Sequence, residues 1–201
     1  YDGAGYSIDN LTINRPSNHY KYVGFFGQTN YATIKNLSLT NVNFTNAYHV
    51  AGSFVGLSRS TTIDNCSASG SVTSTSFVGG LVGYHHASNG IIRNSYSTVS
   101  VGGSSNGSYI GGLVGYLGSA HILNSYSTGS VVGGGSAYRG GLVGYRSGGS
   151  VTDSFYDTTT SGQSDTGKGT GKTTAQMKTK ATFTDNSSTD LITSWDFNYI
   201  W

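Results

Sequence analysis

GGLVGY occupies residues 79–84, 111–116 and 140–145 of the chain. A second pattern recurs in step with it: an aliphatic residue, any residue, and then Asn or Asp. This pattern ends at Asn10, Asn36, Asn65, Asn94, Asn124 and Asp153. The intervals between these six positions are 26, 29, 29, 30 and 29 residues. Self-similarity at such a fixed period is typical of stacked structural repeats.

Each repeat is predicted to form β-strands, because Val, Ile, Tyr, Ser and Thr dominate. No segment has apolar residues at the 3.6-residue period of a helix. Small or apolar residues alternate after the Asn, as Cys66, Ala68 and Val72 do, and we expect them to point inward. Ile63 is also expected to point inward, yet it precedes Cys66 by an odd interval, so the strand must bend near Asn65. A bend at the same place in every repeat predicts an all-β fold, a β-solenoid of about six coils with a ~29-residue repeat.

The chain divides into three predicted segments. Residues 1–157 form the solenoid, residues 158–173 form a Gly/Ser/Thr-rich linker, and residues 174–201 form a C-terminal cap in which Thr174 starts a short helix. The cap is expected to cover the unpaired edges and core of the last coil with five side chains, Phe183, Trp195, Phe197, Ile200 and Trp201. In GGLVGY the glycines are expected to permit tight corners or close backbone approach, and Leu81, Leu113 and Leu142 to fill the core.

The Asn column has two interpretations. One is a structural ladder, in which each amide of Asn10, Asn36, Asn65, Asn94 and Asn124, and the carboxylate of Asp153, bonds to the coil above or below. The other is a turn residue that tolerates unusual backbone angles. The ladder predicts that Asn94→Ala costs about 1 to 3 kcal/mol.

Composition excludes several classes of protein. The chain has 201 residues, a net charge of +2 and no run of Lys or Arg, so we expect no nucleic-acid partner. No segment is apolar for the roughly 18 residues that a spanning helix needs, and we expect no direct membrane insertion. The single cysteine, Cys66, excludes a disulfide framework or a zinc cluster and is expected to be a buried filler. We expect no metal and no cofactor.

Catalytic patterns are weak throughout. The stretch SGQSDTGKGTGKTT resembles a phosphate-binding loop, but the first copy has Gly169 where Ser or Thr belongs, the second has Thr166 where the first Gly belongs, and no helix pattern follows. His85 and His86 follow GGLVGY in a variable position, where a solvent-exposed loop pair is expected. All nine acidic residues are Asp, and they are mostly dispersed, which disfavours the paired carboxylates of glycoside hydrolysis. We therefore expect a protein that is not an enzyme.

The outward positions carry rings and hydroxyls. Alternation places Tyr96, Thr98, Tyr126 and Thr128 on the outer face after the Asn, and a second aromatic column includes Tyr109 and Tyr138. Exposed Tyr beside Ser and Thr suits the binding of sugars or of a protein surface. The alternative is that cross-strand Tyr and Thr pairs merely stabilise the sheet.

The segments GGLVGY with IRNSYSTVSV, GGLVGY with ILNSYSTGSV, and GGLVGY with VTDSFYD resemble the GLUG-motif repeat. The resemblance spans about residues 79–157 and extends in degenerate form back to residue 8, where FFG and SFVG replace GLVG. It implies a secreted or cell-surface bacterial protein, an adhesin or haemagglutinin-like protein, with this chain as part of a larger multidomain protein. It assigns no catalytic residues.

The expected function is a non-catalytic adhesion or surface-binding module that recognises a host or neighbouring cell-surface glycan or protein, or a rigid stalk. One alternative is a solenoid that binds ice or crystalline polysaccharide through regular Ser and Thr rows. A less favoured alternative is a polysaccharide-acting enzyme.

Overall fold

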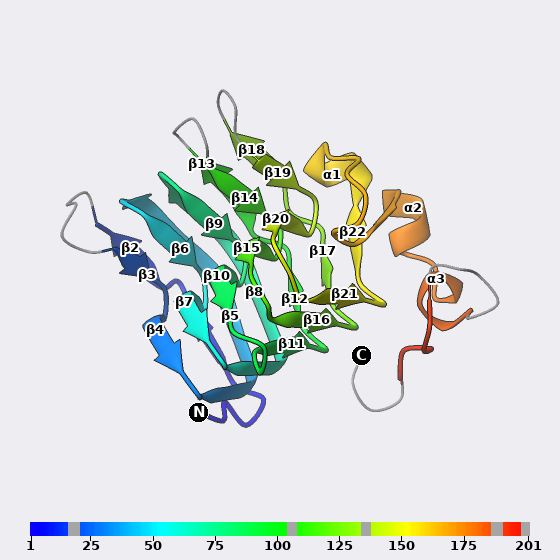
Figure 1. The fold of residues 1–201 in the computed structure, drawn as a ribbon, viewed down its shortest axis with the longest axis horizontal. Coiled ribbons are helices and arrows are strands. Elements are labelled where there is room, and N and C mark those ends of the chain that lie inside the picture. Colours follow the sequence, from blue (N-terminus) through cyan, green and yellow to red (C-terminus); the bar gives the residue numbers. More distant parts are fainter. Residues whose placement is uncertain (16–20, 104–107, 134–137, 186–190, 198–201) are drawn as a thin grey trace.

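The computed structural model describes residues 1–15, 21–103, 108–133, 138–185 and 191–197. In these residues the chain winds into a β-solenoid whose coils stack along the long axis of the molecule (Figure 1). Three sheets run along the stack, and all of their strand pairings are parallel. Sheet A has 13 strands, and sheets B and C have five strands each. Each coil passes from sheet B to sheet C and then to sheet A.

The strand bounds are as follows. Sheet A contains β1 (Ser7–Asp9), β2 (Thr12–Asn14), β5 (Thr33–Ala47), β8 (Thr62–Ser74), β11 (Ile91–Arg93), β12 (Tyr96–Ser97), β13 (Ser100–Gly103), β16 (His121–Leu123), β17 (Tyr126–Ser127), β18 (Val131–Gly133), β21 (Ser150–Thr152), β22 (Phe155–Asp157) and β23 (Thr170–Lys172). Sheet B contains β3 (Tyr22–Val23), β6 (Val50–Gly52), β9 (Phe77–Gly79), β14 (Tyr109–Gly111) and β19 (Tyr138–Gly140). Sheet C contains β4 (Phe26–Asn30), β7 (Val55–Arg59), β10 (Val82–His86), β15 (Val114–Leu117) and β20 (Val143–Arg146).

The predicted β-solenoid is confirmed, with about five full turns. Sheets B and C each contribute five strands to the described residues, whereas sheet A begins one level earlier with β1 and β2. The core has the expected rows of aliphatic side chains, and Ile34, Ile63, Ile92 and Ile122 are all buried. A second row, Leu81, Leu113 and Leu142, is fully buried as predicted.

The glycines of GGLVGY lie where sheet B turns into sheet C. A Cβ on Gly79 would overlap the carbonyl oxygen of Val82 and lie 2.8 Å from the backbone N of Gly115 in the next coil. A Cβ on Gly115 would lie 2.7 Å from the backbone N of Val78. The two sheets therefore approach to backbone contact at this corner, and only glycine fits there.

Three short helices and β23 follow the last coil in the described residues. Helix α1 (Thr158–Ser161) is capped by Asp157, and α2 (Thr174–Met177) starts at the predicted Thr174, with a capping box between Thr173 and Gln176. Helix α3 (Ala181–Thr184) completes the described C-terminal part. In the described residues no helix has the length and apolar character needed to cross a bilayer.

The structure differs from the expectation in how the last coil is covered. Residues 158–173, for which a linker is predicted, contain α1 and β23, and β23 pairs with β22. Lys168 Nζ donates to the carbonyl oxygens of Gly144 (2.8 Å) and Arg139 (3.1 Å), and Asp165 Oδ1 accepts from Gly141 N at 2.8 Å. These two side chains therefore bind backbone groups at the last strands of sheets B and C.

The predicted cap side chains pack elsewhere. Phe183 and Trp195 form a cluster with the fully buried Phe155, and Tyr126, Met177 and Phe197 pack against it. Because Phe155 continues the outward row of Tyr126, the cap covers the outer face of sheet A rather than the core. Ile200 and Trp201 lie outside the described residues.

One further expectation is wrong. His86 is exposed, but His85 is fully buried and its Nδ1 lies 2.9 Å from Ser58 Oγ. The parity of β10 places His85 on the inward side, in register with the buried Ser58 and Leu117 of the neighbouring coils.

Candidate functional site

Two columns of rings run along the stack on the outside of sheets B and C. One column lies on sheet B and contains Phe77, Tyr109 and Tyr138, which are in register on β9, β14 and β19. The other lies on sheet C and contains Tyr84, Tyr116 and Tyr145, in register on β10, β15 and β20. We call these six side chains the ring face.

The rings contact one another along and between the columns. In sheet B the ring centroids are 5.1 Å apart for Phe77–Tyr109 and 5.2 Å for Tyr109–Tyr138, and both pairs are stacked. Between columns, Phe77 lies 5.5 Å from Tyr84, and Tyr109 lies 5.4 Å from Tyr116. Each offset or edge-to-face pair contributes about 0.5–1.5 kcal/mol beyond its burial, so the ring face is a rigid surface.

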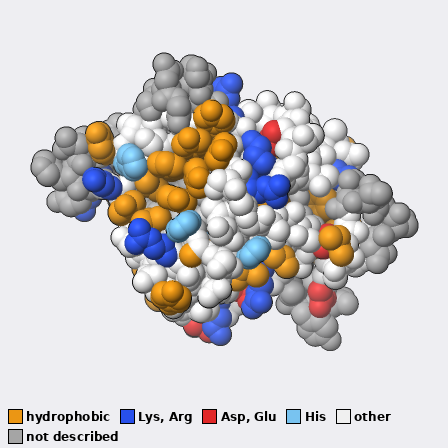
Figure 2. Space-filling model, viewed as in Figure 1, with side chains coloured by type: hydrophobic (Ala, Val, Ile, Leu, Met, Phe, Trp, Pro, Cys, Tyr) orange, Lys and Arg blue, Asp and Glu red, His pale blue; other side chains and the backbone are white. Residues whose placement is uncertain are grey.

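The ring face is partly open to solvent. Tyr138 is 52% exposed, and the other five rings are half-buried. Outward side chains of sheet B contact outward side chains of sheet C here. The two sheets therefore form an angle that opens toward the solvent, and the rings fill that angle. Figure 2 shows the resulting hydrophobic patch over sheets B and C, bordered by Lys, Arg and His side chains. Contiguous exposed apolar patches of this kind mark interaction surfaces.

The aromatic column expected from the sequence accounts for only the sheet B half of the ring face. Tyr109 and Tyr138 lie in it, whereas Tyr84, Tyr116 and Tyr145 were missed as surface residues. The available signal is the last letter of GGLVGY, which recurs in all three copies. Pairing of this column with the sheet B column depends on the angle between the sheets, and no local pattern encodes that angle.

The other four predicted contacts lie on a different surface. Tyr96, Thr98, Tyr126 and Thr128 line one side of a groove of about 600 Å³ on the outer face of sheet A. Tyr96 and Tyr126 stack with centroids 4.9 Å apart. The other side of the groove is formed by the C-terminal part of the chain, including Met177, Trp195 and Phe197.

Tyr126 is largely covered in this groove. Its ring lies 6.1 Å from Trp195 and 6.4 Å from Phe183, centroid to centroid. Burial raises the pKa of the Tyr126 phenol, and the neighbouring Tyr96 adds to this effect. Thr98 remains exposed and Tyr96 half-buried, so these two are the predicted residues of sheet A that a ligand would reach first.

The Asn column is a column of left-handed backbone positions. Asn36, Asn65, Asn94, Asn124 and Asp153 all have φ between 42° and 54°. Asn65 Nδ2 donates to Asn36 Oδ1 at 2.9 Å, and this is the single amide-to-amide bond of a ladder among the described residues. Asn and Asp tolerate this conformation better than other side chains, and it produces the bend inferred from strand parity.

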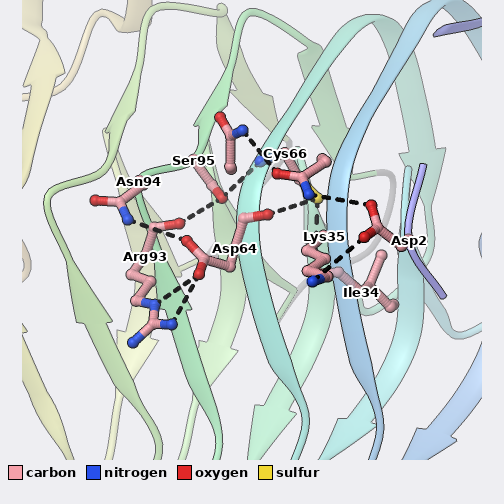
Figure 3. A network of polar contacts seen from close by, with 10 residues as sticks. Asp2, Ile34, Lys35, Asp64, Cys66, Arg93, Asn94 and Ser95 are labelled. Atoms are coloured by element: carbon pink, nitrogen blue, oxygen red, sulfur yellow. Dashed lines mark hydrogen bonds and ion pairs between the residues drawn. The ribbon is translucent and has the colours of Figure 1, made fainter. Parts of the chain in front are cut away.

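Two further members of the column, Asn94 and Asp153, bond to other groups. Figure 3 shows Asn94 donating to Asp64, which also pairs with Arg93 at 2.8 Å. Asp153 accepts from Ile192 N and from Thr193 N and so ties the C-terminal segment to the solenoid. Asn10 lies outside the column, because the register Asp9↔Thr40 places it beside Asn41 instead of Asn36.

A serine ladder runs one residue after the Asn column. Ser95 Oγ accepts from Cys66 N at 3.1 Å, Ser125 Oγ from Ser95 N at 3.4 Å, and Ser154 Oγ from Ser125 N at 3.2 Å. Each hydroxyl also donates to the carbonyl two residues earlier, at 2.7 Å. The left-handed residue of the Asn column interrupts the strand pairing. The backbone N–H of the residue after it therefore donates to the serine hydroxyl of the next coil.

The thiol of Cys66, the single cysteine of the chain, is buried. Burial raises the pKa of the Cys66 thiol to about 11, so the thiolate form is disfavoured. Over the described ranges, no group of three His, Cys or Asp side chains lies close enough to hold a metal ion.

Comparisons with known proteins agree with the repeat pattern. The family model for the GLUG motif matches residues 47–73, 76–102 and 106–132. The first match contains the degenerate copy AGSFVG, and the copy from 140 onward lies outside the matched residues. The chain is 40% identical over 114 residues to a "Putative Gly-rich membrane protein" of Evansella cellulosilytica, covering 55% of this chain and 12% of that protein.

Two further matches concern a second sequence relative and a solved structure. Halomucin of Haloquadratum walsbyi is 39% identical over 85 residues, which is 41% of this chain and 1% of halomucin. This chain therefore spans a small fraction of both relatives. A solved structure from Bacteroides ovatus, described as "a putative immunoglobulin A1 protease", superposes with a TM-score of 0.58 at 20% identity, covering 77% of this chain and 50% of that one. At this identity the likeness shows a shared fold.

The names of the sequence relatives and the occurrence of the motif indicate a surface or secreted protein. The resemblance identified in the sequence is confirmed by the three matched repeats and by the solenoid that they build. The chain therefore contains three GLUG-motif repeats within a β-solenoid.

Proposed function

We propose that this chain is a non-catalytic binding module of a bacterial surface or secreted protein, and that it recognises glycans through the ring face. The observation that carries the proposal is the double column of six mutually contacting, partly exposed rings. Aromatic rings offer sugars a flat apolar surface, and phenol hydroxyls add hydrogen bonds at little entropic cost.

The geometry suits an extended ligand. The three levels of rings follow consecutive coils, and strands in neighbouring coils are about 4.8 Å apart. A chain of sugar rings laid along the stack would meet one pair of aromatic rings at each level. The ladders of the sheets hold these rings in place, so binding requires little reorganisation of the protein.

The proposal is tested by glycan-array and cell-surface binding of the purified chain. Tyr109→Ala removes the ring that contacts both columns, including Phe77, Tyr116 and Tyr138, and should weaken binding at least tenfold. Tyr6→Ala is the matched control, because Tyr6 is 76% exposed and lies outside the ring face. It should bind as the unmodified chain does.

Tyr96→Ala separates the two surfaces that carry predicted contacts. Loss of binding in Tyr96→Ala with normal binding in Tyr109→Ala would assign recognition to the groove of sheet A. Absence of binding to every glycan and cell surface would contradict recognition by this chain and leave the rigid-stalk role.

A further inference from the structure

A small pocket adjoins the N-terminal end of the ring face. It has a volume of about 300 Å³ and is lined by Tyr22, His49, Val50, Leu57, Arg59, Phe77, Tyr84 and His86. This volume is at the lower end of the roughly 300–1,000 Å³ typical of small-molecule sites. The pocket therefore suits a single sugar unit at the end of the surface, rather than a second length of chain.

The apolar side of the pocket belongs to the ring face itself. Phe77 and Tyr84 are stacked with centroids 5.5 Å apart and an interplanar angle of 12°. His49 extends the same surface, because its ring lies 5.4 Å from Phe77. On the other side, the ring of His86 lies 5.6 Å from Tyr84. A pyranose ring placed on Phe77 and Tyr84 would lie between the two imidazoles.

The polar side of the pocket is basic. Arg59 ends β7 on the same outward row as Leu57, and its register partner on β10 is His86. The Arg59 guanidinium is close enough to Tyr84 to counteract the rise in the Tyr84 pKa that burial and Tyr116 cause. Lys21 lies near His49 and, with burial, lowers the pKa of that imidazole.

Among the described residues, no acidic side chain lines the pocket or pairs with Arg59. The residues that line the pocket include no Asp. The ion pairs of the described residues join Lys35 to Asp2, Arg93 to Asp64 and Lys168 to Asp165, and none involves Arg59. In addition, His49 Nδ1 is buried without a hydrogen-bond partner in the described structure. An exposed guanidinium without an acidic partner, beside a surface of rings, suits a ligand that carries an anionic group.

We infer that this pocket, formed by Arg59, His49, Phe77 and Tyr84, binds a carboxylate-bearing sugar such as a uronic acid. The sugar ring stacks on Phe77 and Tyr84, and its carboxylate meets the planar fork of Arg59, which matches carboxylate geometry bidentately. The inference rests on the proposed glycan recognition and specifies its ligand as an acidic glycan.

The test compares oligogalacturonate with its methyl ester in calorimetric titrations of the purified chain. The ester keeps the sugar ring and removes the charge, so it should bind at least tenfold more weakly than the acid. Arg59→Ala should weaken oligogalacturonate binding at least tenfold and leave ester binding unchanged. Arg59→Lys, which retains the charge without the fork, should recover only part of the loss.

Arg146→Ala is the matched control, because Arg146 is also an exposed arginine that ends a strand of sheet C. It carries the same change in net charge and should bind oligogalacturonate normally. Circular dichroism melting of each variant verifies that it is folded. Rising salt should weaken binding of the acid and leave binding of the ester unchanged.

The outcomes separate this inference from the proposed function. Equal binding of acid and ester overturns the acidic-sugar site while glycan recognition stands. Failure of both probes to bind also overturns the site, and recognition is then decided by the glycan array. Dextran sulfate that binds more tightly than oligogalacturonate, with the same dependence on Arg59, shows a site for sulfate esters and overturns the carboxylate assignment.

Discussion

At the scale of single residues, backbone conformation at the bend determines where the hydrogen bonds of each coil go. Asn94 has a φ of 51°, which costs most side chains energy. Its amide also donates to Asp64 at 3.0 Å. Backbone tolerance and this side-chain bond are therefore separable contributions at one position.

Two substitutions at Asn94 separate these contributions. Asn94→Ala loses both the conformational tolerance and the bond, and should lower the free energy of unfolding by about 1–3 kcal/mol. Asn94→Gly keeps the tolerance and loses only the bond, so its effect should be smaller. Urea unfolding measures both, and an unchanged midpoint in the Ala variant would contradict the assignment.

The serine ladder makes a second residue-scale prediction. Ser125→Ala removes the acceptor for the buried Ser95 N and the donor to the partly buried Leu123 O. The expected loss is about 1–3 kcal/mol in the free energy of unfolding. Ser100→Ala on the outer face is the control and should stay within about 0.5 kcal/mol of the unmodified chain. Equal effects in the two variants would rule out the ladder as a source of stability.

At the scale of elements, the end of the stack is the weak point of a solenoid. The last strands of sheets B and C would present unpaired backbone groups, which pair readily with other chains. Lys168 and Asp165 form hydrogen bonds with some of these groups. In sheet A, β23 pairs with β22, the strand of the last coil. The segment between the solenoid and α2 is thus part of the end cover.

Lys168→Met should expose the edge of β19 and β20. Gly144 O and Arg139 O lose their donor, so we expect a destabilisation of about 1–3 kcal/mol and increased self-association. Analytical ultracentrifugation and thermal melting measure the two effects. Lys178→Met, at an exposed lysine of the C-terminal part, should change neither. A monomeric and fully stable Lys168 variant would show that the edge is covered by other groups.

At the scale of the whole molecule, a buried histidine couples folding to pH. Burial, with smaller contributions from the charges of His121 and His86, lowers the pKa of His85 to about 3. In the unfolded chain the pKa of His is about 6.5, so the unfolded state binds more protons between these two values. The contribution of the neutral, buried His85 to the free energy of unfolding is therefore fully present above about pH 6.5. It is lost as the pH falls toward about 3.

This loss should amount to about 2 kcal/mol at pH 5 relative to pH 7. His85→Leu copies the residue of the next coil at this position, Leu117, and should remove that part of the pH dependence. Urea midpoints at pH 5 and pH 7 give the comparison. His49, whose pKa is also lowered by burial, contributes in the same direction in both proteins. An identical pH dependence in the variant would contradict the assignment to His85.

The sequence by itself determined the repeat, the strand parity and the bend. These follow from local chemistry, since alternation fixes which side chains face the core and Asn supplies the left-handed residue at each bend. Ile63, Leu81 and Val99 are buried as alternation and spacing predict. The GGLVGY glycines were also assigned correctly to a close approach of backbones.

Only the tertiary structure decided what gathers on the surface. The ring face joins two columns from different sheets, and Arg59 meets Phe77 and Tyr84 at one pocket although they come from different coils. Likewise, Asn10 falls beside Asn41 because register in the first coil is set by pairing with β5 and not by spacing. The physical reason is that alternation fixes the direction of each side chain, whereas the angle between sheets and the register between coils depend on packing across the whole stack.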